Sequence, residues 1–466
     1  MKIAFHGAAR TVTGSKHLIT LNNGKKILLD CGLFQGMGRE TDSLNQQFGF
    51  DAQTIDAMVL SHAHIDHCGL VPKLVKDGYR GKIWCTPATK DLASILMEDS
   101  GGIQESEAKY ANKRNAAEGR PFVKPLYTED DAKAAVEHLF PMEYDQWFTI
   151  LDGVEVMFAD AGHIIGSASV HVRVTENGKT RQISFSGDVG RYRDAILRSP
   201  AVFPQADFVI LESTYGNKIH EEMAHSPEIL LEWIVKTCLQ KKGKLIIPAF
   251  SVGRTQEILY SLNQLELEGR LPPVDYIVDS PLSSEATFVI KSHPENFNAT
   301  LQEILKTDKD PFDFKGLKYT RTVEDSKLLN FRREPCVIIS ASGMAEAGRV
   351  KHHISNNIEN SRNTILFSGY CEPFSLGGKL KQHPTEVNIF GIHHEVHAEI
   401  AEMKSMSAHG DYDDLCQFLA CQDPKKVRTL FLVHGEYEVQ QDFSNSLIKK
   451  GFDVEIPAYH EEFDLG

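Results

Sequence analysis

The chain has 466 residues, enough for two domains, and 41% of them are hydrophobic, which permits sizeable cores. It contains no run of about 20 apolar residues, so the sequence predicts no membrane-spanning helix. The formal net charge of −14 argues against a general nucleic-acid-binding protein, although a narrow basic groove can hold a single strand on an acidic protein.

Short strands punctuated by glycine are expected in the first part of the chain. Residues 1–7 are predicted to form the first strand and not a signal peptide. A helix is expected over residues 69–77, and an irregular or helical excursion over residues 101–127. The eight cysteines are scattered and include no C-x-x-C pair, which favours a reduced, cytoplasmic protein.

Four side chains that can bind metal lie in one short turn. The sequence His62-Ala63-His64-Ile65-Asp66-His67 directly follows the apolar run Ala57-Met58-Val59-Leu60. Imidazole and carboxylate are the ligands of hydrolytic zinc sites, at roughly 2.0–2.2 Å from the metal. Three histidines and one aspartate in six positions are too many for an ordinary surface loop. The turn therefore predicts a metal site, and its crowding indicates two ions.

Further ligands are expected downstream in similar settings, because two ions need more than this turn supplies. His163, Asp188 and His434 each follow an apolar strand and adjoin a glycine that lets backbone pass close to a buried site. Each residue alone is as well explained as a capping or core residue. Their recurrence in one chain indicates one shared site.

From about residue 213, apolar strands alternate with helices, which predicts a parallel α/β sheet. Ligands bind beyond the carboxyl ends of such strands. The candidates for phosphate binding are Arg254 at a helix start, Ser342 and Gly343 before a later helix, and Arg349 within that helix. Ordinary capping and loop glycines are the alternative explanation. From about residue 397 the chain is expected to return to the first domain and to end on a helix over 437–449 and a short strand.

The order of Asp30, the His-x-His-x-Asp-His turn, His163 and Asp188 resembles the metallo-β-lactamase superfamily. The resemblance implies a four-layer αββα sandwich with the metals at the sheet edges. It implies that one zinc is held by His62, His64 and His163, the other by Asp66, His67 and His434, with Asp188 bridging. It also implies that Asp30 braces the ligand turn.

Three further motifs resemble the β-CASP nucleases of this superfamily. They are Leu211-Glu212-Ser213-Thr214-Tyr215-Gly216, Met406-Ser407-Ala408-His409-Gly410-Asp411-Tyr412 and Val433-His434-Gly435-Glu436. The resemblance implies that residues 1–212 and 397–466 form the metallo-β-lactamase domain and that 213–396 form an inserted β-CASP domain. In the third motif, His434 resembles the histidine of the RNA-processing branch, and this implies single-stranded RNA as substrate. The chain looks similar to compact bacterial and archaeal relatives of the eukaryotic pre-mRNA 3′-end endonuclease.

The resemblance implies a zinc-dependent ribonuclease with a two-metal mechanism. Asp66 is expected to orient or deprotonate the attacking hydroxide, His409 to act as general acid, and Glu212 to hold His409 and favour its charged form. Ser407 is expected to touch the scissile phosphate. The nitrogen and oxygen ligands also accept manganese or iron. The sequence leaves endonuclease against 5′-exonuclease action open, as well as assembly into a homodimer.

Two other functions are alternatives. A small-molecule metallo-hydrolase, such as a thioesterase or lactonase, needs neither the long insertion nor Glu212 and His409. A non-catalytic RNA-binding homologue is disfavoured because every ligand position is filled. The cluster His393-His394-x-x-His397 matches no motif of the family, and a surface or interdomain role is expected for it.

Overall fold

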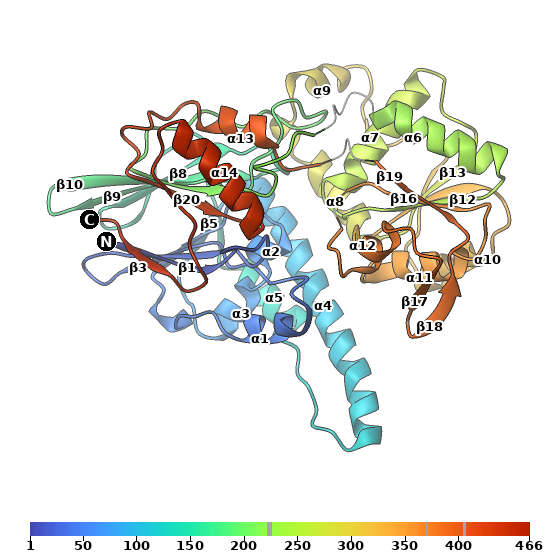
Figure 1. Cartoon of the computed structure of the whole chain (residues 1–466), viewed down its shortest axis with the longest axis horizontal. Coiled ribbons are helices and arrows are strands. Elements are labelled where there is room, and N and C mark those ends of the chain that lie inside the picture. The colour runs from blue at the N-terminus through green and yellow to red at the C-terminus, as the bar shows by residue number, and fades with distance from the viewer. Residues whose placement is uncertain (221–225, 370, 404–406) are drawn as a thin grey trace. The chain divides into compact units, whose positions relative to one another are not determined.

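The computed structural model describes residues 1–466 except 221–225, 370 and 404–406 (Figure 1). The described chain divides into two compact units. Unit 1 comprises Met1–Tyr192, Arg198–Ile219 and His409–Gly466, and unit 2 comprises Arg193–Leu197 and His220–Ala408. No helix among the described residues combines the length and apolar composition that a membrane span needs.

Unit 1 contains two seven-stranded sheets. The first has the order β22 (Glu462–Asp464), β1 (Lys2–Gly7), β2 (Lys16–Thr20), β3 (Lys26–Leu29), β4 (Ala57–Val59), β5 (Ile83–Cys85), β6 (Leu139–Pro141). The second has the order β21 (Val454–Glu455), β20 (Thr429–Val433), β11 (Phe208–Glu212), β10 (Lys179–Phe185), β9 (Ala168–Glu176), β8 (Val154–Asp160), β7 (Phe148–Leu151).

The helices of unit 1 lie on the outer sides of the two sheets (Figure 1). On the side of the first sheet lie α1 (Thr41–Gln46), α2 (Ile65–Cys68), α3 (Val71–Lys76), α4 (Pro87–Glu118) and α5 (Glu129–Val136). On the side of the second sheet lie α13 (Tyr412–Leu419) and α14 (Tyr437–Lys449). This arrangement confirms the expected αββα sandwich.

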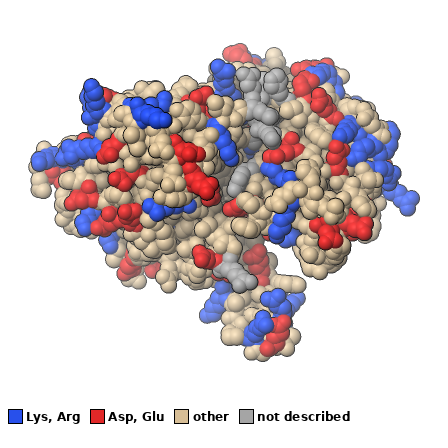
Figure 2. All heavy atoms as spheres, in the orientation of Figure 1, with Lys and Arg blue, Asp and Glu red and all other residues tan. Residues whose placement is uncertain are grey.

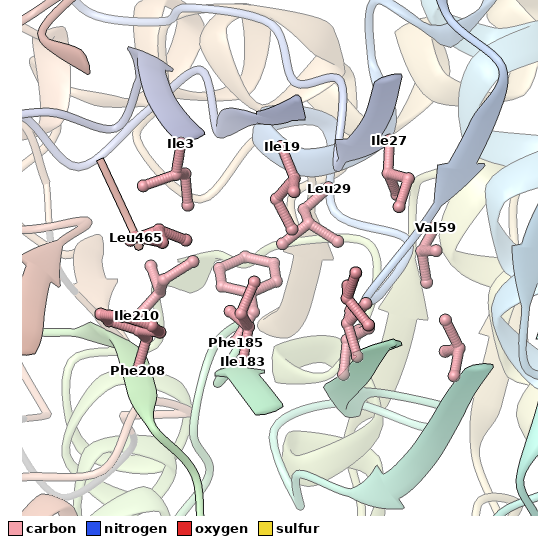
Figure 3. Close-up of a cluster of buried hydrophobic side chains, with 14 of the residues drawn as sticks. Ile3, Ile19, Ile27, Leu29, Val59, Ile183, Phe185, Phe208, Ile210 and Leu465 are labelled. Carbon is pink, nitrogen blue, oxygen red and sulfur yellow. The ribbon is translucent and has the colours of Figure 1, made fainter. Parts of the chain in front are cut away.

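Alternating side chains explain why the sheets form layers. On β11, Phe208 and Ile210 face the core between the two sheets, while Val209 and Leu211 face a second core beneath α13 and α14. A period of two is what an extended strand presents to its two faces. Figure 3 shows the first core, in which residues such as Ile19 of the first sheet point toward Phe185 of the second.

Unit 2 is built on one six-stranded sheet in which every pair of neighbours is parallel. Its order is β14 (Leu317–Tyr319), β13 (Asp275–Val278), β15 (Cys336–Ser340), β12 (Lys244–Pro248), β16 (Thr364–Phe367), β19 (Glu399–Glu402). A separate hairpin consists of β17 (Glu386–Ile389) and β18 (Ile392–Glu395). The helices are α6 (Ser226–Ile234), α7 (Arg254–Leu267), α8 (Pro281–Lys291), α9 (Ala299–Ile304), α10 (Val323–Phe331), α11 (Gly348–Asn357) and α12 (Leu376–Leu380). The parallel α/β sheet expected for this part of the chain is confirmed.

The structure refines three expectations. The helix expected over 69–77 is α3, which begins at Val71, and a separate short helix, α2, lies before it within the histidine turn. Residues 101–118 are helical, as the second half of α4, and the irregular part begins only at Gly119. The last strand of the unit 2 sheet, β19, lies beyond residue 396, because it pairs with β16. The limits of the compact units, at Ile219 and Ala408, lie 7 and 12 residues beyond 212 and 396, the expected domain boundaries, which stay a prediction.

Candidate metal centre

The predicted site residues lie in the loops that follow six strands of unit 1. Within the second sheet β10, β11 and β20 are parallel neighbours, with Phe185 opposite Ile210 and Glu212 opposite Val433. The residues that follow these strands therefore meet at one sheet edge. β3 and β4 are parallel neighbours in the first sheet and end at Asp30 and at the histidine turn. β8 leads into the loop of His163.

The backbone around the histidine turn is fixed by close packing. The main-chain oxygen of Asp66 accepts a hydrogen bond from the Ser15 N–H at 2.8 Å, and that of His67 accepts one from the Cys31 N–H at 2.8 Å. Gly32 lies so close that a Cβ there would stand 1.6 Å from the Asp66 oxygen. Only glycine fits at this approach, and the turn is held as a rigid platform.

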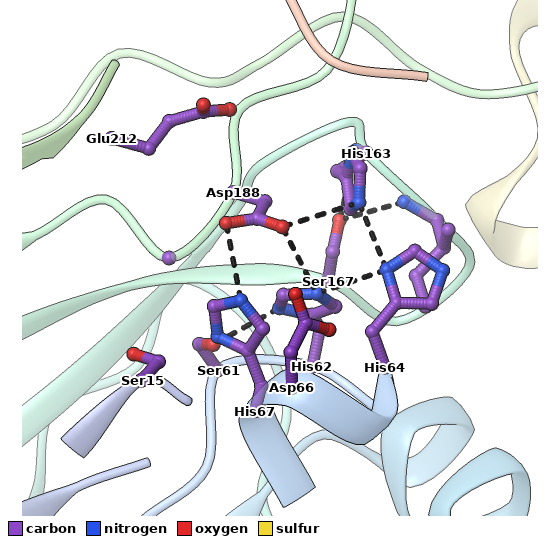
Figure 4. Close-up of polar contacts among 12 residues, drawn as sticks. Ser15, Ser61, His62, His64, Asp66, His67, His163, Ser167, Asp188 and Glu212 are labelled. Atoms are coloured by element: carbon purple, nitrogen blue, oxygen red, sulfur yellow. Dashed lines mark hydrogen bonds and ion pairs between the residues drawn. The ribbon is translucent and has the colours of Figure 1, made fainter. Parts of the chain in front are cut away.

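The first group of candidate ligands comprises His62, His64, His163 and Asp188, whose ligand atoms all lie within 4.8 Å of one another. Nδ1 of His64 is 3.2 Å from Nε2 of His62 and 3.1 Å from Nε2 of His163. Asp188 Oδ2 is 3.5 Å from Nε2 of both His62 and His163. Three imidazoles and one carboxylate oxygen thus converge on one point (Figure 4).

A second group comprises Asp66, His67 and His434. Asp66 Oδ2 lies 3.3 Å from His434 Nε2. The other oxygen of Asp188, Oδ1, lies 3.2 Å from His67 Nε2 and 3.6 Å from His434 Nδ1. Asp188 therefore presents one carboxylate oxygen to each group, the geometry that a bridging ligand requires.

Two buried polar atoms at this point suit a cation between them. His67 Nε2 and Asp188 Oδ1 face each other, and neither has a hydrogen-bond partner among the described residues. Buried polar atoms are almost always satisfied, so an unpaired nitrogen and oxygen in contact distance call for a shared partner. The donor set of imidazoles and carboxylates fits a zinc-like ion.

The electrostatics of the first group keep its imidazoles available as ligands. Burial lowers the pKa of His62 to about 3 and that of His64 to about 4, and it holds the pKa of His163 well below its usual value. A neutral imidazole has a free lone pair, which a metal requires.

The second group attracts positive charge. Burial opposes a proton on His67, but Asp188 and Asp30 raise the pKa of His67 well above its usual value. Burial also opposes the charge of Asp188, yet the neighbouring imidazoles, among them His434, hold the pKa of Asp188 well below its usual range. Its carboxylate therefore stays ionised and able to bind a cation.

Asp30 braces the turn from behind. It is fully buried and has φ +59°, a left-handed conformation that is costly for a residue with a side chain. Its Oδ1 accepts the Ser61 N–H at 2.7 Å, and its Oδ2 accepts the Ser61 hydroxyl at 2.8 Å. Oδ2 also lies 2.7 Å from His67 Nδ1. These contacts fit the bracing role expected for Asp30, which stays a prediction.

His409 lies beside the two groups and contacts Glu212. His409 Nδ1 is 3.1 Å from Glu212 Oε1 and 3.9 Å from Asp188 Oδ2. Burial opposes its charge, but the charge and hydrogen bond of Glu212, helped by Asp188, raise the pKa of His409 to about 9. A histidine that is protonated at neutral pH can donate a proton.

The expected phosphate-binding residues lie in unit 2. Arg254 is buried at the start of α7 and forms an ion pair with Glu257. Gly343 packs on Phe250, whose ring a Cβ would meet at 2.7 Å, so the loops after β12 and β15 lie side by side. Arg349 Nη1 lies 2.6 Å from Asp279 Oδ1, and that guanidinium is therefore engaged within the unit.

Three further expectations concern Ser342, Ser407 and the histidine cluster near residue 394. The Ser342 hydroxyl donates to the Ala347 oxygen at 3.3 Å. Ser407 is half-buried, whereas Met406, the first residue of its motif, lies outside the described residues. His393, His394 and His397 pair with three separate glutamates, Glu386, Glu359 and Glu395. They form no joint site among the described residues.

Several supporting residues were missed in the sequence. The Thr214 hydroxyl donates to Glu212 Oε2 at 2.6 Å and lies 3.1 Å from His434 Nδ1. The hydroxyls of Thr86 and Thr89 donate to the Gly166 oxygen at 2.7 and 2.8 Å and fix the loop of His163. Thr214 lies two positions after Glu212 in the same motif, and this nearness could have identified it as a supporting residue. Thr86 and Thr89 are remote from the ligands in sequence and carried none.

Comparisons with known proteins agree with this architecture. The family model of the metallo-beta-lactamase superfamily matches residues 13–221, that of the Beta-Casp domain matches 255–380, and that of the Zn-dependent metallo-hydrolase RNA specificity domain matches 393–457. Ribonuclease TTHA0252 of Thermus thermophilus is 34% identical over 461 residues, covering 99% of both chains.

Two archaeal proteins are also similar. Transcription termination factor FttA of Methanosarcina mazei is 30% identical over 97% of this chain and 69% of its own. An RNase J-like protein of Methanocaldococcus jannaschii is 28% identical over 98% of this chain and 97% of its own. On this evidence the chain belongs to the β-CASP family of the metallo-β-lactamase superfamily.

Proposed function

We propose that the protein is a metal-dependent ribonuclease that hydrolyses phosphodiester bonds of single-stranded RNA. The observation that carries the proposal is the placement of Asp188 between two ligand groups, with the His409–Glu212 pair alongside. The names of two relatives, a ribonuclease and an RNase J-like protein, support it. So does the match to an RNA specificity domain.

Two zinc ions are the proposed cofactors, with manganese or iron as metals that the same ligands accept. His62, His64 and His163 would hold one ion, Asp66, His67 and His434 the other, and Asp188 both. When bound, two such ions supply a nucleophilic water near neutral pH and stabilise charge on the phosphate. In this proposal the carboxylate of Asp66, which lies 3.3 Å from His434 Nε2, orients the attacking water.

The proton for the leaving oxygen comes from His409 in this proposal. Glu212 is fully buried, and its Oε1 also accepts the Val189 N–H at 2.8 Å. With Thr214 bound to the other oxygen, Glu212 cannot rotate freely, so it holds the His409 ring in place. General acids contribute about 10²–10⁴-fold to a rate.

The unit 2 residues Arg254, Ser342, Gly343 and Arg349, together with Ser407, are proposed to bind the RNA backbone. We also place the protein in the cytoplasm, because all eight cysteines are free. A homodimer remains part of the proposal, to be measured by light scattering.

Cleavage of single-stranded RNA labelled at either end, beside the matching DNA, tests the function. Zinc-loaded wild type should cut the RNA, and His409→Ala should keep both metals and lose most turnover. His397→Ala, an exposed histidine of unit 2, is the control and should cut normally. The ladders from the two labels separate endonuclease from 5′-exonuclease action. A wild-type protein that binds two metals and cuts neither polymer would direct the search to thioester and lactone substrates.

A further inference from the structure

The second half of α4 and the chain that follows it extend from unit 1 and carry exposed basic and aromatic side chains. Gly101 is packed against the backbone of Thr128 and Glu129, at the base of the extension. Beyond it α4 continues to Glu118, which at 1.5 Å per residue is about 26 Å. The chain then returns beside the helix (Figure 1). We call residues 103–124 the prong and residues 109–124 its tip.

The tip is a defined structure and not a loose loop. Gly119 ends the helix in the left-handed conformation, and the Arg120 N–H donates to the Asn115 oxygen at 2.9 Å. The Asn112 side chain donates to the Val123 oxygen at 2.9 Å and accepts the Val123 N–H at 2.8 Å. The Asn115 amide donates to the Pro121 oxygen at 2.9 Å. These bonds hold the returning segment along the helix, so its side chains are presented in a fixed arrangement.

The tip is basic although the chain is acidic. Its 16 positions contain five basic residues, Lys109, Lys113, Arg114, Arg120 and Lys124, and one acidic residue, Glu118, in a chain of net charge −14. Arg120 pairs with Glu118 at 3.0 Å, and the other four cations form no ion pair with described residues. Figure 2 shows Lys and Arg gathered at the end of the extension, with some acidic side chains among them. Four uncompensated cations on this structure attract an anionic partner.

Two aromatic rings lie among these cations. Tyr110 is 76% exposed and Phe122 is 71% exposed, so neither contributes to a core. Tyr110 shares one helix face with Lys113 and Arg114, because residues three and four apart are neighbours on a helix. Exposed rings interleaved with cations are the combination that binds single-stranded nucleic acid, through base stacking and phosphate contacts.

We propose that the tip of the prong binds single-stranded RNA at a second site, remote from the metal centre. The proposal rests on the proposed ribonuclease function. One helix links the two sites, because Thr86, the N-cap of α4, and Thr89, in its first turn, fix the His163 loop. Tyr110 lies 21 residues beyond Thr89, about 32 Å along the helix. Only RNA long enough to span this distance gains affinity from the tip.

RNA binding by tip variants tests the proposal in the His409→Ala background, in which the RNA is expected to stay intact. One variant is Lys113→Glu with Arg114→Glu, and another is Tyr110→Ala with Phe122→Ala. The control, Lys425→Glu with Lys426→Glu, makes the same charge change at an exposed site elsewhere in unit 1. The affinity for a fluorescent RNA of about 40 nucleotides, well above the roughly 4–16 that one single-strand site covers, is measured against salt.

The charge variant should weaken binding of the long RNA about 10-fold, and the salt slope should fall by about 0.7 for each phosphate that the tip no longer neutralises. The aromatic variant should weaken binding about 5-fold or more with little change in slope. The control should bind as the parent does. With His409 intact, kcat/KM for an RNA of about 5 nucleotides should stay unchanged in the tip variants, while KM for the long RNA rises.

Two failures are distinguishable. Tip variants that bind long RNA as the parent does would overturn the prong proposal even if the enzyme cuts RNA, and would redirect the tip to a protein partner. A wild type that cuts no RNA, with binding still weakened in the tip variants, would sink the ribonuclease function and leave the RNA site in place. Circular dichroism should show folded variants, because the exchanged side chains are exposed.

Discussion

Asp30 Oδ2 lies 2.7 Å from His67 Nδ1 in the fully buried interior behind the metal centre. A carboxylate only accepts hydrogen bonds, so Nδ1 must carry the proton. His67 Nε2 then carries the free lone pair and faces Asp188 Oδ1 at 3.2 Å. One contact therefore fixes both the tautomer of His67 and the direction of the nitrogen that faces the site.

Asp30→Asn should weaken metal binding about 10–100-fold, the usual effect of losing such a support. An amide can donate to Nδ1 as well as accept from it, so His67 is no longer confined to one tautomer. Competition with a zinc chelator measures the affinity. Asp152→Asn, an exposed aspartate of the same unit, is the control. Unchanged zinc affinity in Asp30→Asn would show that the contact does not select the tautomer.

A buried lysine predicts a pH dependence of stability. Lys16 has no exposed surface, and its Nζ donates to the oxygens of Gly14 and Gly32 at 2.8 and 2.9 Å. Burial lowers the pKa of Lys16 to about 8 from its ordinary 10.5. Between these values the unfolded chain binds more protons than the folded one, so this group makes the free energy of unfolding rise with pH.

Lys16→Met should remove that rise. The wild type should gain up to about 3 kcal/mol of unfolding free energy between pH 8 and pH 10.5 relative to the variant. Urea unfolding at the two pH values measures it, and the difference between the proteins cancels other titrating groups. Lys25→Met, an exposed lysine, serves as control. Parallel curves for wild type and Lys16→Met would contradict the prediction.

The histidine turn could be singled out as a candidate metal site because its residues are local. Three histidines and an aspartate within six positions are visible without a fold, and an apolar strand before Asp188 or His434 marks a strand end. That these ends meet at one edge follows from strand order, with β10, β11 and β20 adjacent. Pattern alone does not give that order, and the family resemblance supplied it.

Contacts made by residues far apart in sequence were not predictable in this way. Thr86 and Gly166 are 80 positions apart, and a threonine before a helix is explained fully by its capping bond to Thr89. Arg349 looked like a free anion-binding group, but its carboxylate partner, Asp279, is 70 positions away. The sequence left residues 101–127 as irregular or helical, because Gly101 and Gly102 argue against a helix interior.

Removal of the metals should destabilise unit 1. Without a cation, His67 Nε2 and Asp188 Oδ1 stay buried 3.2 Å apart, and neither forms a hydrogen bond with the described residues. Zinc at 100 times its dissociation constant should add about 2.7 kcal/mol to the unfolding free energy, and a chelator should reverse this. Differential scanning calorimetry with and without chelator measures the change. In Asp188→Asn the chelator should have little effect, whereas an equally large effect there would contradict the bridging role.

The His409–Glu212 pair makes the sharpest prediction about catalysis. A general acid is needed when the leaving oxygen is a poor leaving group and is dispensable when it is a good one. His409→Ala should therefore lose about 10²-fold or more on RNA but much less on a bis(p-nitrophenyl) phosphodiester. Equal losses on both substrates would instead indicate damage to the metal site.

The pH profile of Glu212→Gln tests the same pair independently. The carboxylate of Glu212 helps to raise the pKa of His409 to about 9, against the effect of burial. A general acid works only while protonated, so activity falls as pH rises through its pKa. Glu212→Gln lowers that pKa, and the fall should begin at a lower pH, while activity in acid is less affected. Thr214→Val removes a neighbouring hydrogen bond but keeps the charge, and it should leave the alkaline limb nearly in place. An alkaline limb that stays in place in Glu212→Gln, with the metals bound, would exclude His409 as the group that controls it.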